Sequence, residues 1–201
     1  MNDTWRNTAQ EYLDVAQRLW QRGLLAGNGG SLSLRVVGTS QIAVKPRGIP
    51  NIDCGPDMLL AVDMRSGDTI GGRQPSRDLG IHLSIYRACP DMGGIVLAHG
   101  PWSTAVSLLG YDELPLYSPH AKPKLRRVPL IAGASSTSQE LQAAVGERLR
   151  AADVVAGLLA GRGLVTVGES LRMAGNLAEL VEEAAQVALL VHLGWGGPVS
   201  R

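Results

Sequence analysis

The residues best suited to chemistry lie at the end of an apolar run and in a polar turn that precedes it. The run 95–98 ends on His99, and the turn Ser76-Arg77-Asp78 comes before an amphipathic segment. An imidazole can move a proton near neutral pH, and a carboxylate can act as a general base. Sites in α/β folds commonly lie where strands end. We therefore expect Asp78 and His99 to belong to one site.

Two loops carry further candidates. The glycine-rich stretch 27–30 permits tight backbone with positive φ, and the alternating segment 31–35 after it predicts a half-buried strand. A turn of this kind is only a weak indication of an anion site. The second loop, Lys45-Pro46-Arg47-Gly48, follows the expected strand 41–45 and carries a guanidinium, which suits carboxylates and phosphates.

The elements that must position these residues follow from hydrophobic periodicity. Helical spacing predicts a helix that begins after Asp78 and ends at Pro90, and another that begins at Pro101. Strands mixed with helices in this order indicate an α/β fold in three layers. The other expected helices are 5–22, 138–152 and 170–193, and the other expected strands are 58–63, 69–72, 95–98, 114–117, 128–132, 154–159 and 164–167.

Bulk properties limit the classes of function. The 201 residues suit one domain over 1–201, and a net charge of +1 gives no argument for a nucleic-acid partner or a membrane surface. No apolar run approaches the roughly 20 residues that span a bilayer. The first residues lack the order of a signal peptide, and Cys54 and Cys89 have no ligand spacing. We expect a cytoplasmic protein with reduced cysteines.

The stretch 74–110 resembles the class II aldolase/adducin family, which includes L-fuculose-phosphate aldolase and L-ribulose-5-phosphate 4-epimerase. The family shows a Ser-Ser-(Glu or Asp) turn, a helix containing His, a proline stop, an IVHTH strand end and a Thr-Ala helix start. The corresponding residues here are Ser76-Arg77-Asp78, His82, Pro90, 95–99 and Thr104-Ala105. The resemblance extends over about residues 8 to 194. It implies a three-layer α/β/α sandwich around a central, mostly antiparallel sheet, and a homotetramer.

The resemblance also implies a site for a substrate phosphate. Family members hold the phosphate with the glycine-rich turn and with small hydroxyl residues. The matching candidates here are Asn28, Gly30, Ser31, Arg47, Gly48, Ser76 and Arg77. Ser31 stands where the family has Asn, while Arg47 and Arg77 replace hydroxyl residues. Two guanidinium groups favour a strongly anionic ligand; the alternative is that both are solvated loop charges.

A zinc ion held by three imidazoles is implied by the family. In this chain the three positions read Leu97, His99 and Arg162. Leucine has no lone pair to offer, and a guanidinium is a permanent cation. We therefore expect no tightly bound zinc, with His99 as the one remaining ligand. A rebuilt set would need His82 or His120.

The family's acid–base residue matches Asp78. Beside His99 and Arg162 it would form a charged cluster in which the guanidinium stabilises a developing oxyanion without a metal. Tyr117, on the expected strand 114–117, is a lesser candidate proton donor. The alternative is a decayed site in which Arg162 only fills space.

The sequence therefore predicts an aldolase-like lyase or isomerase that acts on a small anionic carbonyl compound through an enolate or enediolate. Two alternatives stay open: a non-catalytic, adducin-like binding or structural protein, and a metal-dependent aldolase with a rebuilt ligand set. The basic segment 120–127 is read as a solvated loop or as a lid or subunit-contact loop. The substrate and the type of reaction are left open.

Overall fold

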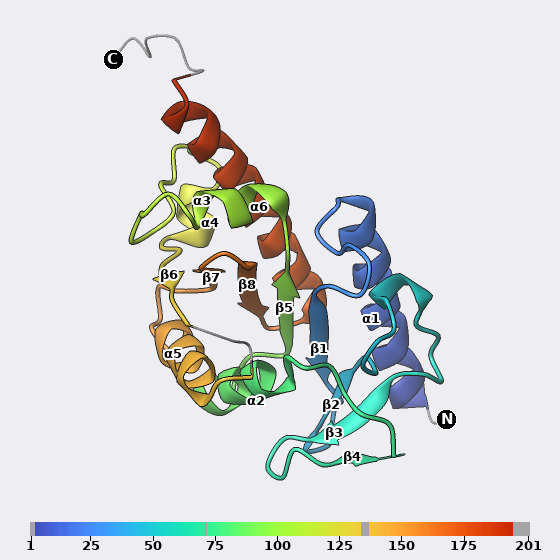
Figure 1. Cartoon of the computed structure of the whole chain (residues 1–201). Coiled ribbons are helices and arrows are strands. Elements are labelled where there is room, and N and C mark those ends of the chain that lie inside the picture. The colour runs from blue at the N-terminus through green and yellow to red at the C-terminus, as the bar shows by residue number, and fades with distance from the viewer. Residues whose placement is uncertain (1–2, 71, 134–136, 195–201) are drawn as a thin grey trace.

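The computed structural model describes residues 3–70, 72–133 and 137–194. Its centre is an eight-stranded sheet in the order β4-β3-β2-β1-β5-β8-β7-β6 (Figure 1). Every pair of neighbouring strands is antiparallel except β6 and β7. The strands are β1 (Ser31–Arg35), β2 (Gln41–Val44), β3 (Leu60–Asp63), β4 (Thr69–Ile70), β5 (Gly94–Ala98), β6 (Leu130–Ile131), β7 (Ala156–Leu159) and β8 (Gly163–Gly168).

Helices cover both faces of the sheet. Their bounds are α1 (Asp3–Gln21), α2 (Leu79–Ala88), α3 (Pro101–Val106), α4 (Lys122–Leu125), α5 (Gln139–Leu149) and α6 (Leu171–His192), with a short 3-10 helix η1 (Asn51–Asp53). The long helices α1 and α6 lie on one face, and α2 and α5 pack side by side on the other (Figure 1). The expected three-layer α/β/α sandwich with a mostly antiparallel sheet is confirmed.

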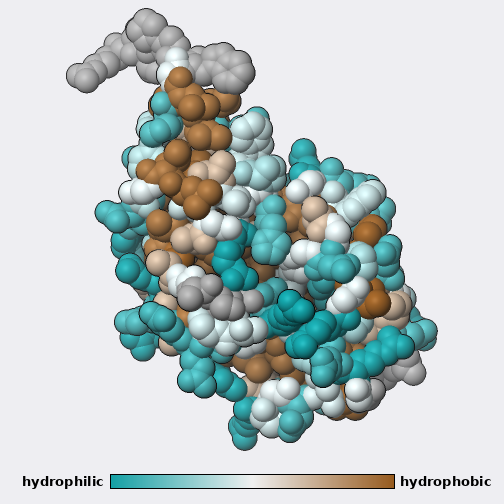
Figure 2. All heavy atoms as spheres, viewed as in Figure 1, coloured by the Kyte–Doolittle hydropathy of each residue, from teal (hydrophilic) through white to brown (hydrophobic). Residues whose placement is uncertain are grey.

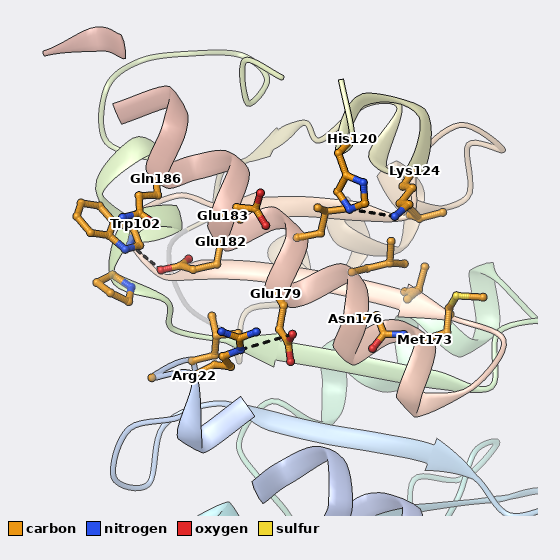
Figure 3. Close-up of a pocket in the computed structure, with 18 of the residues that line it drawn as sticks. Arg22, Trp102, His120, Lys124, Met173, Asn176, Glu179, Glu182, Glu183 and Gln186 are labelled. Atoms are coloured by element: carbon orange, nitrogen blue, oxygen red, sulfur yellow. Dashed lines mark hydrogen bonds and ion pairs between the residues drawn. The ribbon is translucent and has the colours of Figure 1, made fainter. Parts of the chain in front are cut away.

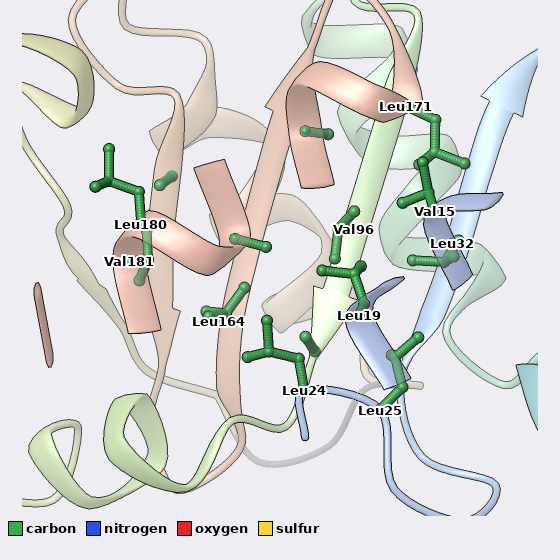
Figure 4. Close-up of a cluster of buried hydrophobic side chains, with 14 of the residues drawn as sticks. Val15, Leu19, Leu24, Leu25, Leu32, Val96, Leu164, Leu171, Leu180 and Val181 are labelled. Carbon is green, nitrogen blue, oxygen red and sulfur yellow. The ribbon is translucent and has the colours of Figure 1, made fainter. Parts of the chain in front are cut away.

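The core on the α1 and α6 face is built from aliphatic side chains of helices and sheet. Leu32 of β1 and Val96 of β5 are opposite each other in the ladder and both are fully buried there. Figure 4 shows the helix and loop partners that surround them, among them Val15, Leu19, Leu24, Leu171 and Val181. Because side chains alternate along a strand, the residues on either side of Leu32 and Val96 must face α2 instead.

The core on the α2 and α5 face holds Ile81 and Ile85 of α2, Leu141 and Val145 of α5, and Leu97 of β5. Ser31 and Ser33 of β1 also point to this face, where they meet α2. The two faces of β1 therefore differ: one is aliphatic, and the other presents hydroxyl groups. This polar face positions the candidate site.

Some expected elements are wrong or shifted. Residues 114–117 form no strand; Glu113 makes an isolated bridge with Pro129, and Pro115 has no backbone N–H to donate to a ladder. The basic segment 120–127 contains the short helix α4, and the expected strand 128–132 is reduced to β6. The expected return 69–72 is only the two-residue β4, and residue 71 lies outside the described residues.

The inner face of the last helix is not purely apolar. Val191 is 40 % exposed and Glu182 is buried instead. Apolar side chains gather on the projecting C-terminal part of α6, where Leu193 is also exposed (Figure 2). Among the described residues, no helix combines the length and the apolar character needed to cross a membrane.

Candidate active site

The candidate residues converge because β1 begins, β5 ends and β8 begins at the same edge of the sheet. The register pairs Ser31 with Leu97 and Ala98 with Leu164, so the glycine-rich turn, His99 and Arg162 are neighbours. Gly29 lies so close to the ring of His99 that a Cβ there would be 3.0 Å from its Cδ2 atom. Gly30 has φ +71°, a conformation that favours glycine.

His99 is held in one orientation by its neighbours. Its backbone N–H donates to the carbonyl of Leu24 at 3.1 Å, and its Nδ1 contacts the backbone carbonyl oxygen of Arg162. A carbonyl oxygen can only accept, so Nδ1 carries the hydrogen and Nε2 of the neutral ring keeps its lone pair. The exposed ring lines an open hollow of about 590 Å³ together with Arg162 and the start of α3. Nε2 is therefore available as a base or a ligand.

Asp78 approaches the same edge from the other side. It precedes α2 in the N-cap position, and its backbone N–H donates to Ser76 Oγ at 3.3 Å. Its Oδ2 atom accepts a hydrogen bond from Ser31 Oγ at 3.2 Å. The predicted base is thus half-buried and joined directly to the first residue of β1.

His82, one turn into α2, continues this polar cluster into the core. It is 1 % exposed, with Nε2 at 2.8 Å from Ser31 Oγ and Nδ1 at 2.7 Å from Ser33 Oγ. Burial lowers the pKa of His82 to about 4, and the Asp78 carboxylate opposes that shift. Because both ring nitrogens are occupied by serine hydroxyls, His82 is not free to replace a missing metal ligand.

Lys45 was missed as a site residue by the sequence analysis. It is 3 % exposed, and its Nζ donates to the carbonyl oxygens of Asn28 and Ile49, each at 2.9 Å. Burial lowers the pKa of Lys45, while Cys54 and Asp78 oppose the shift. The ammonium group ties the glycine-rich turn to the 45–50 loop. A lysine at the end of the apolar strand 41–44, directly before a proline, is the feature that could have revealed it.

The loops that carry Arg47 and Arg77 lie side by side. Pro46 and Pro75 form an isolated bridge, and the backbone N–H of Ser76 donates to the Lys45 carbonyl at 3.2 Å. Both guanidinium groups are exposed, and Arg47 Nη1 donates to Gln74 Oε1 at 2.9 Å. Gly48 follows with φ +80°. The structure thus places the two arginines on adjoining loops next to the glycine-rich turn.

Other predicted members of the site are not brought together. In the part of the chain that the structure describes, no ion pair joins Arg162 to Asp78, whose carboxylate binds Ser31 instead. Tyr117 is 53 % exposed and lies outside any strand, which corrects the placement expected from the sequence. His120 lies in the α4 segment, where its Nε2 is 3.1 Å from Lys124 Nζ.

Comparison with known proteins identifies the family. Residues 10–189 match the family described as Class II Aldolase and Adducin N-terminal domain. The chain belongs to this family. The resemblance found in the sequence is confirmed, and the match extends over the whole candidate site.

Relatives of this class II aldolase family member are lyases. The 3-oxo-tetronate 4-phosphate decarboxylase of Escherichia coli strain K12 is 32 % identical over 188 residues, which cover 90 % of this chain and 86 % of that protein. The 5-deoxy-D-ribulose 1-phosphate aldolase of Bacillus thuringiensis is 29 % identical over 181 residues, which cover 89 % and 82 %. The chain is a class II aldolase-like enzyme.

Solved structures agree with this assignment. YgbL from Escherichia coli superposes with a TM-score of 0.86 at 31 % identity, covering 98 % of this chain and 93 % of that one. The L-fuculose-1-phosphate aldolase of Thermus thermophilus gives 0.83 at 26 % identity, covering 96 % and 100 %.

The residues at the zinc position implied by the class II aldolase family do not suit zinc. Leu97 is 3 % exposed and packs in the core between the sheet and α2, while Arg162 carries a permanent cation. His99 Nε2 is the one imidazole lone pair of the three positions. In the described ranges, no group of three or more His, Cys, Asp or Glu side chains is placed to hold a metal ion. The donor set of this chain therefore does not fit the triad.

A second hollow lies elsewhere, along α6. It measures about 990 Å³, and its labelled charged side chains include Arg22, Lys124, Glu179 and Glu183 (Figure 3). Neither Asp78 nor Ser31 lines it.

Glu182, which lines this hollow, holds the start of α3 next to the candidate site. The Glu182 carboxylate accepts a hydrogen bond from the backbone N–H of Trp102 at 2.8 Å (Figure 3). It accepts a second from the backbone N–H of Ser103 at 3.0 Å. A Cβ at Gly100 would collide with that carboxylate. Glu182 therefore fixes the first turn of α3, which begins two residues after His99. An acidic residue within the apolar stripe of the last helix was the feature that the sequence analysis overlooked.

Proposed function

We propose that this class II aldolase-like lyase cleaves a carbon–carbon bond beside the carbonyl group of a small phosphorylated sugar or sugar acid, through an enolate or enediolate. The observation that carries the proposal is the Asp78 carboxylate joined to Ser31 at the sheet edge where His99 presents Nε2. Relatives named as a phosphorylated-tetronate decarboxylase and a sugar-phosphate aldolase support the substrate class. The enzyme works in the cytoplasm as one domain over 1–201 and as a homo-oligomer, a tetramer in the family's manner.

The phosphate binds to the glycine-rich turn and the two adjoining arginine loops. Arg47 and Arg77 are exposed, and a guanidinium matches phosphate oxygens in a bidentate manner. Gly48 and Gly30, both with positive φ, let the backbone approach the anion closely. Asn28 belongs to the glycine-rich turn that binds the phosphate, and the Lys45 ammonium holds this turn in place through the Asn28 carbonyl oxygen.

The reaction uses groups of this chain alone. Asp78 takes the proton of the substrate hydroxyl, and that part of the substrate leaves as an aldehyde when the carbon–carbon bond breaks. The electron pair of the broken bond moves onto the carbonyl oxygen of the other part, which becomes an enolate. The Arg162 guanidinium stabilises that oxyanion by its fixed charge. Nε2 of His99 takes up a proton from solvent and gives it to the enolate carbon, while Asp78 releases the hydroxyl proton to solvent, so both groups return to their starting states. With a 3-oxo acid, the ionised carboxylate leaves as carbon dioxide without giving a proton to Asp78, and the electron pair of the broken carbon–carbon bond again moves onto the carbonyl oxygen.

The test begins with a search for turnover. Phosphorylated ketoses and phosphorylated 3-oxo acids are screened for aldehyde or carbon dioxide release. Asp78→Asn, His99→Gln and Arg162→Leu are then compared with Arg148→Leu, an exposed change on α5. We expect Arg162→Leu to lower kcat by about 10²–10³, the loss typical of one oxyanion donor. An active protein whose rate is indifferent to all three site changes would exclude this cluster, and a consistent lack of turnover would favour an adducin-like binding protein.

A further inference from the structure

A continuous line of hydrogen-bonding groups runs from Asp78 into the core on the α2 face of the sheet. Asp78 Oδ2 is 3.2 Å from Ser31 Oγ, which is 2.8 Å from His82 Nε2. His82 Nδ1 is 2.7 Å from Ser33 Oγ, which is 3.1 Å from the Tyr86 hydroxyl. The four inner members are at most 2 % exposed. Water therefore has little access to this line beyond Asp78.

The positions of the hydrogens from Ser31 to Ser33 follow from the carboxylate at the end of this line. A carboxylate only accepts, so the single hydrogen of the Ser31 hydroxyl goes to Asp78. Ser31 Oγ must then accept from His82 Nε2, which consequently carries the ring hydrogen. Nδ1 of the neutral ring is left with a lone pair and accepts from Ser33. Ser33 Oγ is then left to accept from the Tyr86 hydroxyl at 3.1 Å, and the carbonyl oxygen of Gly93 is a second, longer acceptor for that hydroxyl at 3.5 Å.

The protonation states that this assignment needs agree with the surroundings. Burial lowers the pKa of His82 to about 4, opposed by Asp78, so the ring is neutral near neutral pH. Burial raises the pKa of Tyr86, opposed by the Ser33 hydrogen bond and by the charge of Arg35. Tyr86 therefore keeps the phenol hydrogen that it donates. Buried hydrogen-bonded lines of this kind fix the orientation of the groups in them.

We infer that His82 is a positioning residue for Asp78, which it orients through Ser31 as the neutral tautomer with hydrogen on Nε2. In that state Ser31 donates to Oδ2, and Oδ1 is left for the reacting group. The role of Asp78 as the base rests on the proposed function, whereas the tautomer and the direction of the hydrogen bonds do not. An imidazole suits this position because it donates at one edge and accepts at the other.

The first experiment measures the tautomer without any substrate. Two-bond ¹H–¹⁵N correlation spectra of ¹⁵N-histidine-labelled protein distinguish a protonated ring nitrogen from an unprotonated one, and the signal lost in His82→Gln assigns the residue. We expect hydrogen on Nε2 and none on Nδ1. Asp78→Leu removes the acceptor, so Ser31 can donate to Nε2 and the Nδ1–H form gains population. Asp57→Leu, an exposed aspartate change, should leave the tautomer unaltered.

Either of two spectroscopic results overturns the inference. One is an Nδ1–H ring in the wild-type protein, and the other is an unchanged Nε2–H ring in Asp78→Leu. These outcomes are independent of turnover. A failure to find any substrate would therefore count against the proposed function and not against the tautomer.

The second experiment asks whether the positioning matters for the reaction. Glutamine offers both a donor and an acceptor, while leucine offers neither, so His82→Gln should retain most of kcat and His82→Leu should lose it. Loss of a partner that orients a metal ligand typically costs about 10–100-fold in activity, and we expect a loss of similar size for His82→Leu. KM should stay nearly constant in both variants, because Arg47 and Arg77 still bind the phosphate. Equal kcat for the two variants, measured on folded protein, contradicts the positioning role.

Discussion

Leu97 lies directly opposite Ser31 in the ladder between β1 and β5. Opposite residues of an antiparallel pair project to the same face, so the leucine side chain stands beside the hydroxyl that binds Asp78. This is the position at which the family resemblance implies the first metal-binding imidazole. The apolar side chain of Leu97 therefore lies next to the hydroxyl group that binds the predicted base, Asp78.

The first prediction concerns zinc. After dialysis, the wild-type protein should retain zinc at a substoichiometric level, because Leu97 offers no lone pair and Arg162 repels a cation. The double variant Leu97→His with Arg162→His should gain tight binding, since three imidazoles suit zinc. Elemental analysis and calorimetric titration with zinc measure both proteins. The single variant Leu97→His is the matched control.

One result would contradict this prediction. If the dialysed wild-type protein retains about one zinc or manganese per chain, the ligand set has been rebuilt with residues beyond the three family positions. In that case the restoring variants should add little affinity.

The second prediction concerns the anion site on the arginine loops. Arg47→Ala or Arg77→Ala should weaken the binding of inorganic phosphate at least about tenfold, since a charge-assisted pair contributes roughly 1.5–3 kcal/mol. The melting temperature should stay nearly constant, because both side chains are exposed. Calorimetric or ³¹P NMR titration measures the dissociation constant. Arg148→Ala, an exposed change on α5, is the control, and unchanged constants in both loop variants would show that these arginines are bystanders.

The fold could be read from the sequence because its main patterns are local. The alternation of 31–35 and the helical spacing after Asp78 depend on residues close in the chain, and both elements formed where predicted. The expectation that 31–35 is half-buried was wrong, because α2 covers the face that carries Ser31 and Ser33. The prediction of a strand over 114–117 was wrong because an extended loop with a proline has the same apolar spacing as a short strand. Periodicity alone does not separate the two.

The candidate site was predictable only where a family motif names its residues. Lys45 and His82 depend on contacts across 17 and 51 positions of the chain, with Asn28 and Ser31 respectively. Nothing in the local sequence fixes such distances. The cluster of Asp78, His99 and Arg162 stays a prediction: the Asp78 carboxylate binds Ser31, and no ion pair joins it to Arg162 in the described residues.

The third prediction concerns the support of α3 by Glu182. Glu182→Gln should lower the free energy of unfolding by about 1–3 kcal/mol, because two backbone N–H groups lose a charged acceptor at the start of a helix. One of these groups would then face an amide NH₂ that can only donate. Urea unfolding measures the difference. Glu183→Gln changes the exposed neighbour on the same helix and should stay within about 0.5 kcal/mol of wild type.

A comparable loss in both glutamate variants would contradict this account, since it would point to a general effect of charge on α6. If the account holds, Glu182→Gln should also broaden the NMR signals of His99, which lies two residues before α3. Glu183→Gln should leave them sharp.

The last prediction follows from the buried imidazole. The folded-state pKa of His82 is about 4, whereas an unfolded histidine has a pKa near 6.5. Between these values the unfolded chain binds a proton that the folded chain does not, so this group makes stability fall as the pH falls. The stability is fully present above about pH 6.5 and is lost progressively towards pH 4, with a full effect of roughly 3 kcal/mol.

Urea unfolding at a series of pH values from about 7 to 4 measures this dependence. His82→Gln should show a shallower loss of stability on acidification than the wild-type protein, because its side chain has no proton to bind in this window. His120→Gln removes an exposed histidine and should keep the wild-type slope. Carboxylates titrate in the same range, but they are common to all three proteins, so the difference in slope isolates His82. Parallel curves for His82→Gln and wild type would mean that the buried ring takes up its proton as readily as a free one.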